Sequence, residues 1–296
     1  MARGEHVVRV GGIDYLNALP LTRYIEEEQT PALKVSNHVP SVLAQKLRQG
    51  DLDIALVPVV EYLACEEYRI LPGICIASYG EVRSIRLYHR RPLSEVHNVG
   101  LDECSLTSAM LTRVFFRDLW RGSPSFRQVS PQQATAVLSA SDSTITVDGE
   151  ELDAVLLIGD AALDVSPRPG WETVDLGTEW TRWTGLPCIY AFWVWRGWPS
   201  PAGLVEIFER AKNTGLARID DIVASLHLGA DFEAVACRHY LNRVIQYDLG
   251  HLQLEGLLEF YKRLKGLPEL LRHGLVDEPT NLGSLRWLDA PELAPA

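Results

Sequence analysis

The sequence lacks any apolar stretch of about 18 residues, the length that a membrane-spanning helix needs. Its first residues likewise contain no apolar run of the kind found in a signal peptide. Five cysteines are scattered along the chain and none forms a CxxC pair, so free buried thiols are expected rather than a disulfide framework. Together these absences favour a cytoplasmic protein with no membrane partner.

Positive charge is also scarce, since 28 Lys and Arg stand against 39 Asp and Glu and leave a net charge of -11. Nucleic acids and anionic membrane surfaces reward clustered cations, so neither is an expected partner. A small organic anion stays open as a ligand. A buried site can hold an anion with helix N-termini, whatever charge the outer surface carries.

The sequence patterns of metal and cofactor chemistry are missing as well. There is no HExxH, no GxSxG and no phosphate-binding loop, and the eight His occur singly. The adjacent glycines of GGIDYLN do not form GxGxxG, which argues against a dinucleotide site. We therefore expect a site without a metal or a cofactor.

The patterns that are present predict an α/β protein. A short apolar strand ends at Ile13, and further strands are expected at 33–38, 53–58, 68–77, 84–89, 98–101, 143–147, 152–158 and 189–195. Helices are expected after most of them, and the segment 39–50 is a compact helix signal that stops at Gly50. The C-terminal part predicts amphipathic helices, with no strand evident through Lys265.

A short internal sequence similarity, called the echo below, predicts two lobes. GDLDIALVPVVEYL at 50–63 resembles EELDAVLLIGDAAL at 150–163, one strand-to-helix unit in each half of the chain. With 296 residues, two domains are the prior expectation. We expect the chain to cross near 90–93 and near 187–191, so that the first lobe comprises 1–90 plus 190–296 and the second 91–189. A ligand cleft is expected between them.

Polar residues at strand ends are the candidates for the site. Asn17 and Tyr15 follow the first strand, where Asn17 either caps a helix or donates to a substrate oxygen. Ser41 stands at a helix start, where capping and anion binding are both open. Ser84 sits in a strand-like segment without an obvious packing purpose, which favours a ligand contact.

The second half of the chain adds hydroxyls and one carboxylate. Ser105, Thr107 and Ser108 crowd one helix start, and a single hydroxyl would suffice for a cap. Asp160 ends a buried strand, where a capping role and a role in the cleft are equally open. An aromatic group is expected to be mostly core, with one or two rings walling a pocket: Trp180, Trp183, Tyr190, Phe192, Trp193 and Trp195.

These segments resemble a known family. GGIDYLNALPL, VPSVLAQKLRQGDLDIALVPVVEYL, SIRLY, LTSAMLTRV, LLIGDAAL and DLGTEWTRWTGLPCIYAFWVWR are similar to the chorismate dehydratases of the futalosine route to menaquinone, from about residue 8 to about residue 261. The resemblance implies a two-lobed type II periplasmic-binding-protein fold with a C-terminal helical segment, no cofactor and chorismate as the substrate. A homodimer stays open as the assembly.

The implied reaction removes water from chorismate and gives 3-[(1-carboxyvinyl)oxy]benzoate. It needs a grip on two carboxylates, which the helix starts at Ser41 and at Thr107 and Ser108 would supply. Asn17 or Ser84 would assist the leaving hydroxyl. No residue of the matched motifs is an evident base, so a carboxylate of the substrate itself is the expected proton acceptor, and the protein acts by positioning.

Two alternatives share this fold. One is a binding protein for a small organic anion, which the missing signal peptide disfavours. The other is the sister family of dihydroxynaphthoate synthases, which carries Ser-Pro-Cys-Pro-Asn-Asp after the first strand and a catalytic His in the second lobe. This chain has GGIDYLNALP at that place, and residues 121–159 contain no His. Both departures favour the dehydratase.

Overall fold

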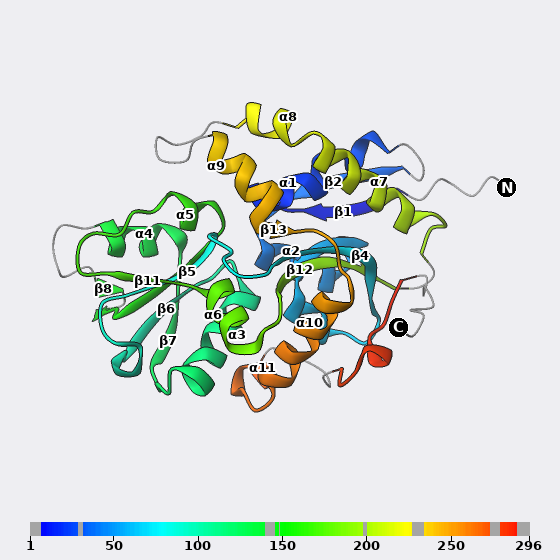
Figure 1. The fold of residues 1–296 in the computed structure, drawn as a ribbon. Helices are drawn as coiled ribbons and strands as arrows, with labels where there is room; N and C mark the ends of the chain where they lie inside the picture. The colour runs from blue at the N-terminus through cyan, green and yellow to red at the C-terminus, as the bar shows by residue number, and fades with distance from the viewer. Residues whose placement is uncertain are drawn as a thin grey trace.

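The computed structural model describes residues 7–28, 32–139, 146–147, 149–197, 200–226, 234–272 and 279–288. They form two α/β lobes that lie side by side, each built around a sheet of its own (Figure 1). This is the mixed α/β architecture that the sequence predicts.

The first lobe is built on a six-stranded sheet. Its strands are β1 (Val8–Gly12), β2 (Leu33–Asn37), β3 (Ile54–Pro58), β4 (Tyr68–Ser78), β12 (Cys188–Arg196) and β13 (Ile245–Gln246). They are ordered β13-β4-β12-β3-β1-β2, with β1 parallel to β2 and β3, and with β12 antiparallel to β3 and β4. All five residues of β3 are buried, as the continuous apolar run of a central strand requires.

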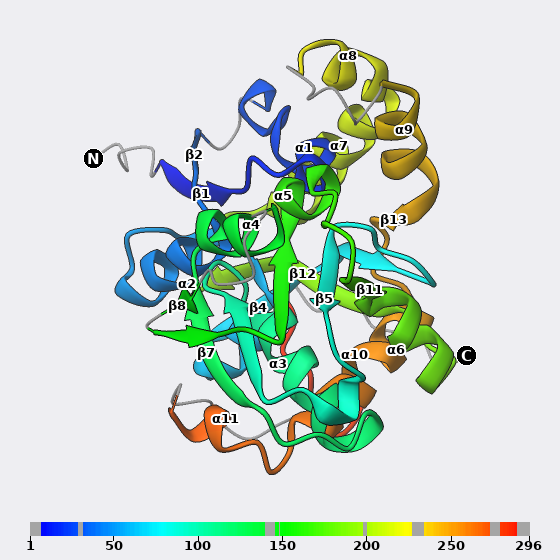
Figure 2. The same ribbon diagram turned by 90° about the vertical axis from the view of Figure 1, so that its left-hand side faces the viewer.

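The second lobe has a five-stranded sheet and a short hairpin. The strands are β5 (Ile85–His89), β6 (Asn98–Asp102), β7 (Ser125–Val129), β10 (Ala154–Ile158) and β11 (Glu172–Asp175), and the hairpin is β8 (Thr146–Val147) with β9 (Glu150–Glu151). The order is β11-β5-β10-β6-β7, and Figure 2 shows this lobe facing the viewer. Of the strand expected at 143–147, residues 143–145 lie outside the described part of the chain.

Helices surround both sheets. Those of the first lobe are η1 (Leu16–Ala18), α1 (Leu19–Thr22), η2 (Ile25–Glu27), α2 (Pro40–Gln49), η3 (Val59–Ala64), α7 (Leu204–Ala217), α8 (Ile219–Ala224), α9 (Ala234–His239), η6 (Tyr240–Val244), α10 (His251–Leu264) and η7 (Leu282–Ser284). Those of the second are η4 (Leu93–Glu95), α3 (Leu106–Val114), η5 (Phe115–Leu119), α4 (Pro131–Ser139), α5 (Gly159–Asp164) and α6 (Leu176–Thr184). The short α11 (Pro268–Arg272) contacts the second lobe, where Glu269 pairs with Arg113. No helix of the described residues has the length and apolar character needed to cross a bilayer.

Local sequence explains where α2 begins and ends. Pro40 occupies its first turn, where the missing N–H costs nothing. Gly50 closes it in the left-handed region with φ 78°, and its N–H donates to the carbonyl of Leu47. The apolar residues Leu43 and Leu47 are fully buried, so the helix presents one face to the sheet.

The echo in the sequence corresponds to two equivalent strands. β3 covers 54–58 and β10 covers 154–158, and each runs parallel to a preceding strand of its own sheet, β1 or β6. Helical turns follow both strands, η3 after β3 and α5 after β10. The two lobes therefore present comparable strand ends to each other.

The chain crosses between the lobes at two places. β5 pairs with β10 and β11, so it already belongs to the second sheet. The first crossing therefore lies between Ser78 and Ile85, and the expectation of a crossing at 90–93 is wrong because β5 is the antiparallel partner that completes the second sheet. The return lies between Thr184 and Cys188, at the edge of the expected 187–191.

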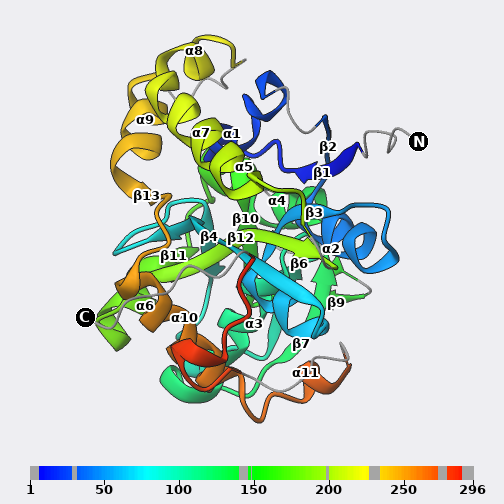
Figure 3. The same ribbon diagram turned by 90° about the vertical axis from the view of Figure 1, so that its right-hand side faces the viewer.

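The C-terminal part closes the molecule around the crossings. The helix α10 packs against β12 of the first lobe and α3 of the second. Gly256 of α10 permits this approach, because a Cβ there would lie 2.2 Å from the carbonyl oxygen of Pro187. The expectation of no strand through Lys265 is wrong for β13, a two-residue strand that pairs with the edge of β4. Figure 3 shows this side, with the described end of the chain lying against the first lobe.

Candidate functional site

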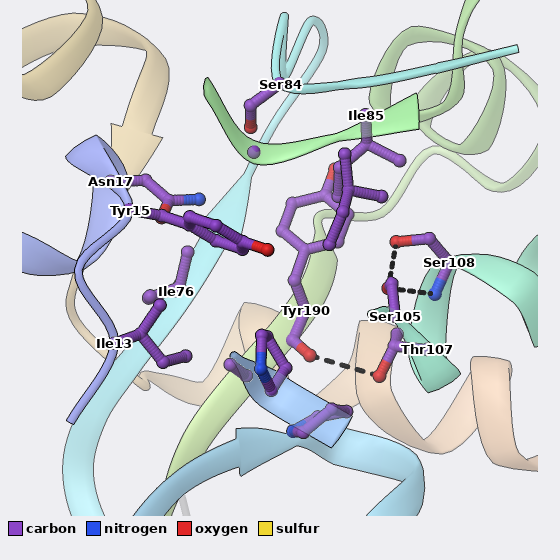
Figure 4. Close-up of a pocket in the computed structure, with 15 residues that line it drawn as sticks. Ile13, Tyr15, Asn17, Ile76, Ser84, Ile85, Ser105, Thr107, Ser108 and Tyr190 are labelled. Carbon is purple, nitrogen blue, oxygen red and sulfur yellow. Dashed lines mark hydrogen bonds between the residues drawn. The ribbon is translucent and has the colours of Figure 1, made fainter. Parts of the chain in front are cut away.

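A cavity of about 50 Å³ lies between the lobes (Figure 4). Around it the chain leaves the carboxyl ends of β1, β3 and β10 and begins α2 and α3, which is where open α/β sheets bind ligands. Six of the eight site residues predicted from the sequence line it: Tyr15, Asn17, Ser84, Ser105, Thr107 and Ser108. The space suffices for a few water molecules and is smaller than a typical ligand pocket.

Asn17 reaches the cavity from η1, the short turn that follows β1. Tyr15 is the N-cap of η1 and Ala18 that of α1, and neither of these residues caps its helix with its own side chain. Capping was the alternative role for Asn17, and the structure removes it. Figure 4 shows the Asn17 amide on the same side of the cavity as Tyr15.

Ser84 lies in the first crossing and is 1% exposed. Its Oγ accepts a hydrogen bond of 2.7 Å from the hydroxyl of Tyr240, and its carbonyl accepts one of 2.8 Å from the N–H of Gly159. The preceding residue Arg83 has φ 62°, and the Asp175 carboxylate accepts from its N–H at 2.7 Å. The turn that presents Ser84 is thus fixed from both sides. Ser84 stands just before β5 rather than inside a strand.

The start of α3 supplies the hydroxyls of the second lobe. Ser105 is its N-cap: the Oγ accepts from the Ser108 N–H at 3.2 Å and donates to the Ser108 Oγ at 2.8 Å. Thr107 donates to the carbonyl of Tyr190 in β12 at 3.1 Å, which ties α3 to the first lobe. Ser105 therefore caps and Thr107 bridges, while Ser108 keeps its own proton for a partner in the cavity.

The start of α2 faces the cavity from the first lobe. Pro40 lines the space, whereas Ser41 is half-buried beside it and makes no capping bond. Ser41 is thus the one predicted hydroxyl that the structure leaves outside the lining. In the first turn of α2, Pro40 has no N–H and the N–H of Val42 donates to the Val39 carbonyl at 3.0 Å, which leaves the N–H of Ser41. In α3 the N–H of Ser108 donates to the Ser105 Oγ, which leaves those of Leu106 and Thr107 at the positive end of the helix dipole.

Tyr15 spans the gap between the lobes. A Cβ on Gly159 would lie 3.1 Å from its ring, so the absence of a side chain there admits the tyrosine. Gly159 also has φ 62°, which glycine adopts without strain. Burial raises the pKa of Tyr15, with the nearby Cys104 and Asp102 adding to the effect, so the phenol stays neutral.

Asp160 is not a lining residue but an interlobe contact. Its Oδ1 accepts a hydrogen bond of 3.0 Å from the backbone N–H of Leu16, the residue between Tyr15 and Asn17. Burial raises the pKa of its carboxyl, and the bond from Leu16 opposes this. A carboxylate pointing into the cavity would repel an anionic ligand, whereas this one holds η1 in place.

The described side chains that line the cavity carry no charge at neutral pH. Among the described residues that line it, no side chain is an acid or a cationic base. An anion would therefore meet helix N-termini, hydroxyls and one amide instead of Arg or Lys. The described residues also contain no group of three or more His, Cys, Asp or Glu that could hold a metal ion.

Two residues of the site were not singled out from sequence. Tyr190 was expected only as one member of an aromatic group, yet it lines the cavity, and its hydroxyl shares a 2.9 Å hydrogen bond with Ser78. Tyr240 was missed entirely. It sits in a C-terminal helical stretch, and only the folded chain brings it to Ser84.

Comparisons with known proteins agree with this geometry. A family described as menaquinone biosynthesis matches residues 8–266. A chorismate dehydratase of Thermus thermophilus is 28% identical over 272 residues, covering 86% of this chain and 93% of the relative. A chorismate dehydratase of Campylobacter jejuni is 24% identical over 263 residues, covering 87% and 97%.

The fold also has solved counterparts. A Candida albicans protein, described as having the generic periplasmic binding protein structural fold, superposes with a TM-score of 0.57 at 12% identity. The match covers 97% of this chain and 99% of that one. The predicted periplasmic-binding-protein-like fold is confirmed.

Proposed function

Because the chain belongs to the menaquinone biosynthesis family, we infer that it is a lyase that dehydrates chorismate to 3-[(1-carboxyvinyl)oxy]benzoate. The observation that carries this is the family match over 8–266, together with two curated chorismate dehydratases that are similar along most of their length. The cavity suits the substrate class, because it offers hydrogen-bond donors for an anion and no competing carboxylate in its lining.

Chorismate carries two carboxylates, and the cavity has two helix starts. α2 comes from the first lobe and offers the N–H of Ser41, and α3 comes from the second and offers those of Leu106 and Thr107. A carboxylate at each start would bridge the lobes and neutralise both dipole ends. Ser108 adds a hydroxyl donor on the α3 side.

The leaving hydroxyl needs a hydrogen-bond donor, and Asn17 and Ser84 are placed to supply it. Ser84 accepts from Tyr240, so its own proton is available to the cavity. Asn17 offers an amide N–H without carrying charge. Neither side chain is ionisable, so their role is to orient the substrate and to stabilise the departing oxygen.

The proton acceptor must come from elsewhere. The ring proton beside the enol ether goes to the acceptor, the neighbouring C–O bond breaks, and the acceptor returns the proton to the departing hydroxyl, so that water leaves and the ring becomes aromatic. No described lining residue is a base at neutral pH. A carboxylate of the substrate itself takes the proton in the conformer that the cavity holds, and the ring carboxylate accepts electron density through its conjugated double bond. This is catalysis by positioning.

We also propose that the chain acts in the cytoplasm, on the futalosine route. All five cysteines are free, as a reducing compartment would keep them. The route is the one to which the sequence motifs are similar.

The test is to incubate purified protein with chorismate and to follow benzoate-type absorbance and the product mass. The expected product is lighter than chorismate by one water and forms equally fast in EDTA. Stoichiometric binding by calorimetry without any product would instead support an anion-binding protein of the same fold.

A further inference from the structure

Tyr240 is fully buried behind the two residues proposed to touch the leaving hydroxyl. It is the first residue of η6, a π-helical turn that continues α9, and η6 packs against η1, which carries Asn17. π-turns inside helices recur at functional sites. The Tyr240 hydroxyl donates to the Ser84 Oγ at 2.7 Å.

The same hydroxyl also interacts with Asn17. Burial raises the pKa of Tyr240, and a side-chain hydrogen bond with Asn17 opposes the rise, as an amide N–H that donates to the phenol oxygen would. The phenol is therefore neutral and keeps its proton as a donor. One oxygen thus contacts Asn17 of the first lobe and Ser84 of the first crossing.

The direction of these bonds decides what Ser84 can do. A serine oxygen that accepts from Tyr240 is left with its own proton to donate, and Ser84 lines the cavity. Hydrogen bonds in such a chain polarise one another, which makes the last donor stronger. The phenol therefore turns Ser84 into a donor aimed at the ligand.

We propose that Tyr240 is a positioning residue that orients Asn17 and Ser84 through its hydroxyl and fixes Ser84 as a donor to the substrate. This rests on the proposed function. Tyr240 does not line the cavity and touches no substrate. Its effect on the reaction passes entirely through the two residues that do.

The variant Tyr240→Phe removes the hydroxyl and keeps the ring. We expect kcat to fall about 10- to 100-fold, because a misaligned donor is costly at the reacting centre. KM should change little, since the helix starts hold the carboxylates. In Ser84→Ala with Tyr240→Phe, the combined loss should be smaller than the product of the single losses, as residues of one network are not additive.

Tyr261→Phe is the matched control. Tyr261 is also fully buried, and its hydroxyl donates at 2.7 Å, but to the backbone carbonyl of Val59. Both variants lose one buried hydrogen bond, so their melting temperatures should fall by a similar amount. Only Tyr240→Phe should lower kcat. Equal kcat in the two variants and wild type would overturn the proposal.

A second measurement does not depend on turnover. In protein labelled with ¹⁵N-asparagine, the side-chain amide signals of Asn17 are those that vanish in Asn17→Asp. We expect them to shift in Tyr240→Phe and to stay in place in Tyr261→Phe. Unmoved signals would refute the positioning role. Shifted signals in a protein that does not convert chorismate would leave the contact standing and would refute the proposed function instead.

Discussion

Asn17→Asp separates a catalytic amide from a structural one. The substitution keeps the size of the side chain and exchanges an amide donor for a carboxylate. Asn17 lies in η1, it caps neither η1 nor α1, and it lines the cavity. The substitution should therefore remove only the contacts of the amide with the ligand and with Tyr240.

The magnitude follows from those contacts. Loss of one well-placed donor to a developing charge costs about 100- to 1000-fold in rate. The new carboxylate also faces a dianionic substrate in a cavity whose described lining offers no Arg, Lys or His to offset it. We expect kcat/KM to fall by at least about 100-fold, with a change in unfolding free energy within about 1 kcal/mol.

Asn281→Asp is the control variant, because Asn281 is an asparagine whose role is to cap a helix. Asn281 is the N-cap of η7, where its side chain accepts from the Ser284 N–H in a reciprocal capping box. Asp caps as well as Asn does, so both turnover and melting temperature should match wild type. Turnover of chorismate and thermal melting, measured on both variants, complete the comparison.

One outcome would refute the reasoning about Asn17. If Asn17→Asp turned chorismate over at a near-normal rate with unchanged melting, it would behave as Asn281→Asp does. Asn17 would then have no part in the reaction. Collapsed turnover together with collapsed melting would point to a folding role that the bonds of η1 do not show.

Two further predictions concern lobe motion and pH. The cavity of about 50 Å³ is too small for chorismate, so we expect the lobes to part in the ligand-free protein in solution. Small-angle scattering should then show a smaller radius of gyration when an analogue that is not turned over saturates the protein. An unchanged radius, at saturation confirmed by calorimetry, would contradict lobe closure. Burial raises the pKa of Glu61 from 4.5 to about 7, and the nearby Arg48 opposes the rise. The folded state therefore binds this proton more tightly than the unfolded state does. As a result, the free energy of unfolding falls by up to about 3 kcal/mol as the pH rises from about 4.5 to about 7. Glu61→Gln should lack this loss in urea titrations at pH 5.5 and 7.5, and an identical pH dependence in the variant and wild type would show that Glu61 is not its source.

Much of the site could be predicted from sequence because strand ends carry it. Asn17, Ser84 and Ser108 are polar residues next to apolar strands or at helix starts, and the parallel strands of an α/β sheet bring such positions to one edge. The echo between 50–63 and 150–163 correctly indicated equivalent units, since β3 and β10 are both central strands.

The misses have a common physical cause, which is that they depend on pairing between distant segments. The first crossing was placed too late because a strand pattern at 85–89 does not tell which sheet the strand joins. Tyr240 lies 156 residues from Ser84 in the chain, and no local pattern distinguishes it from a core tyrosine. Asp160 was expected to cap or to line the cleft, yet its partner is the Leu16 N–H across the interface.

The neutral lining of the cavity bears directly on how the reaction can proceed. A cationic side chain would bind the dianion tightly, but it would stabilise the ionised substrate more than the state in which a carboxylate has accepted the proton, which raises the barrier. It would also lower the basicity of the carboxylate that must accept the proton. Helix N-termini and hydroxyls give a weaker, directional grip that leaves this carboxylate basic. With the substrate carboxylate as the proposed base, such a site gains from excluding Arg and Lys, and introducing one at Ser108 would be expected to tighten binding while slowing the reaction.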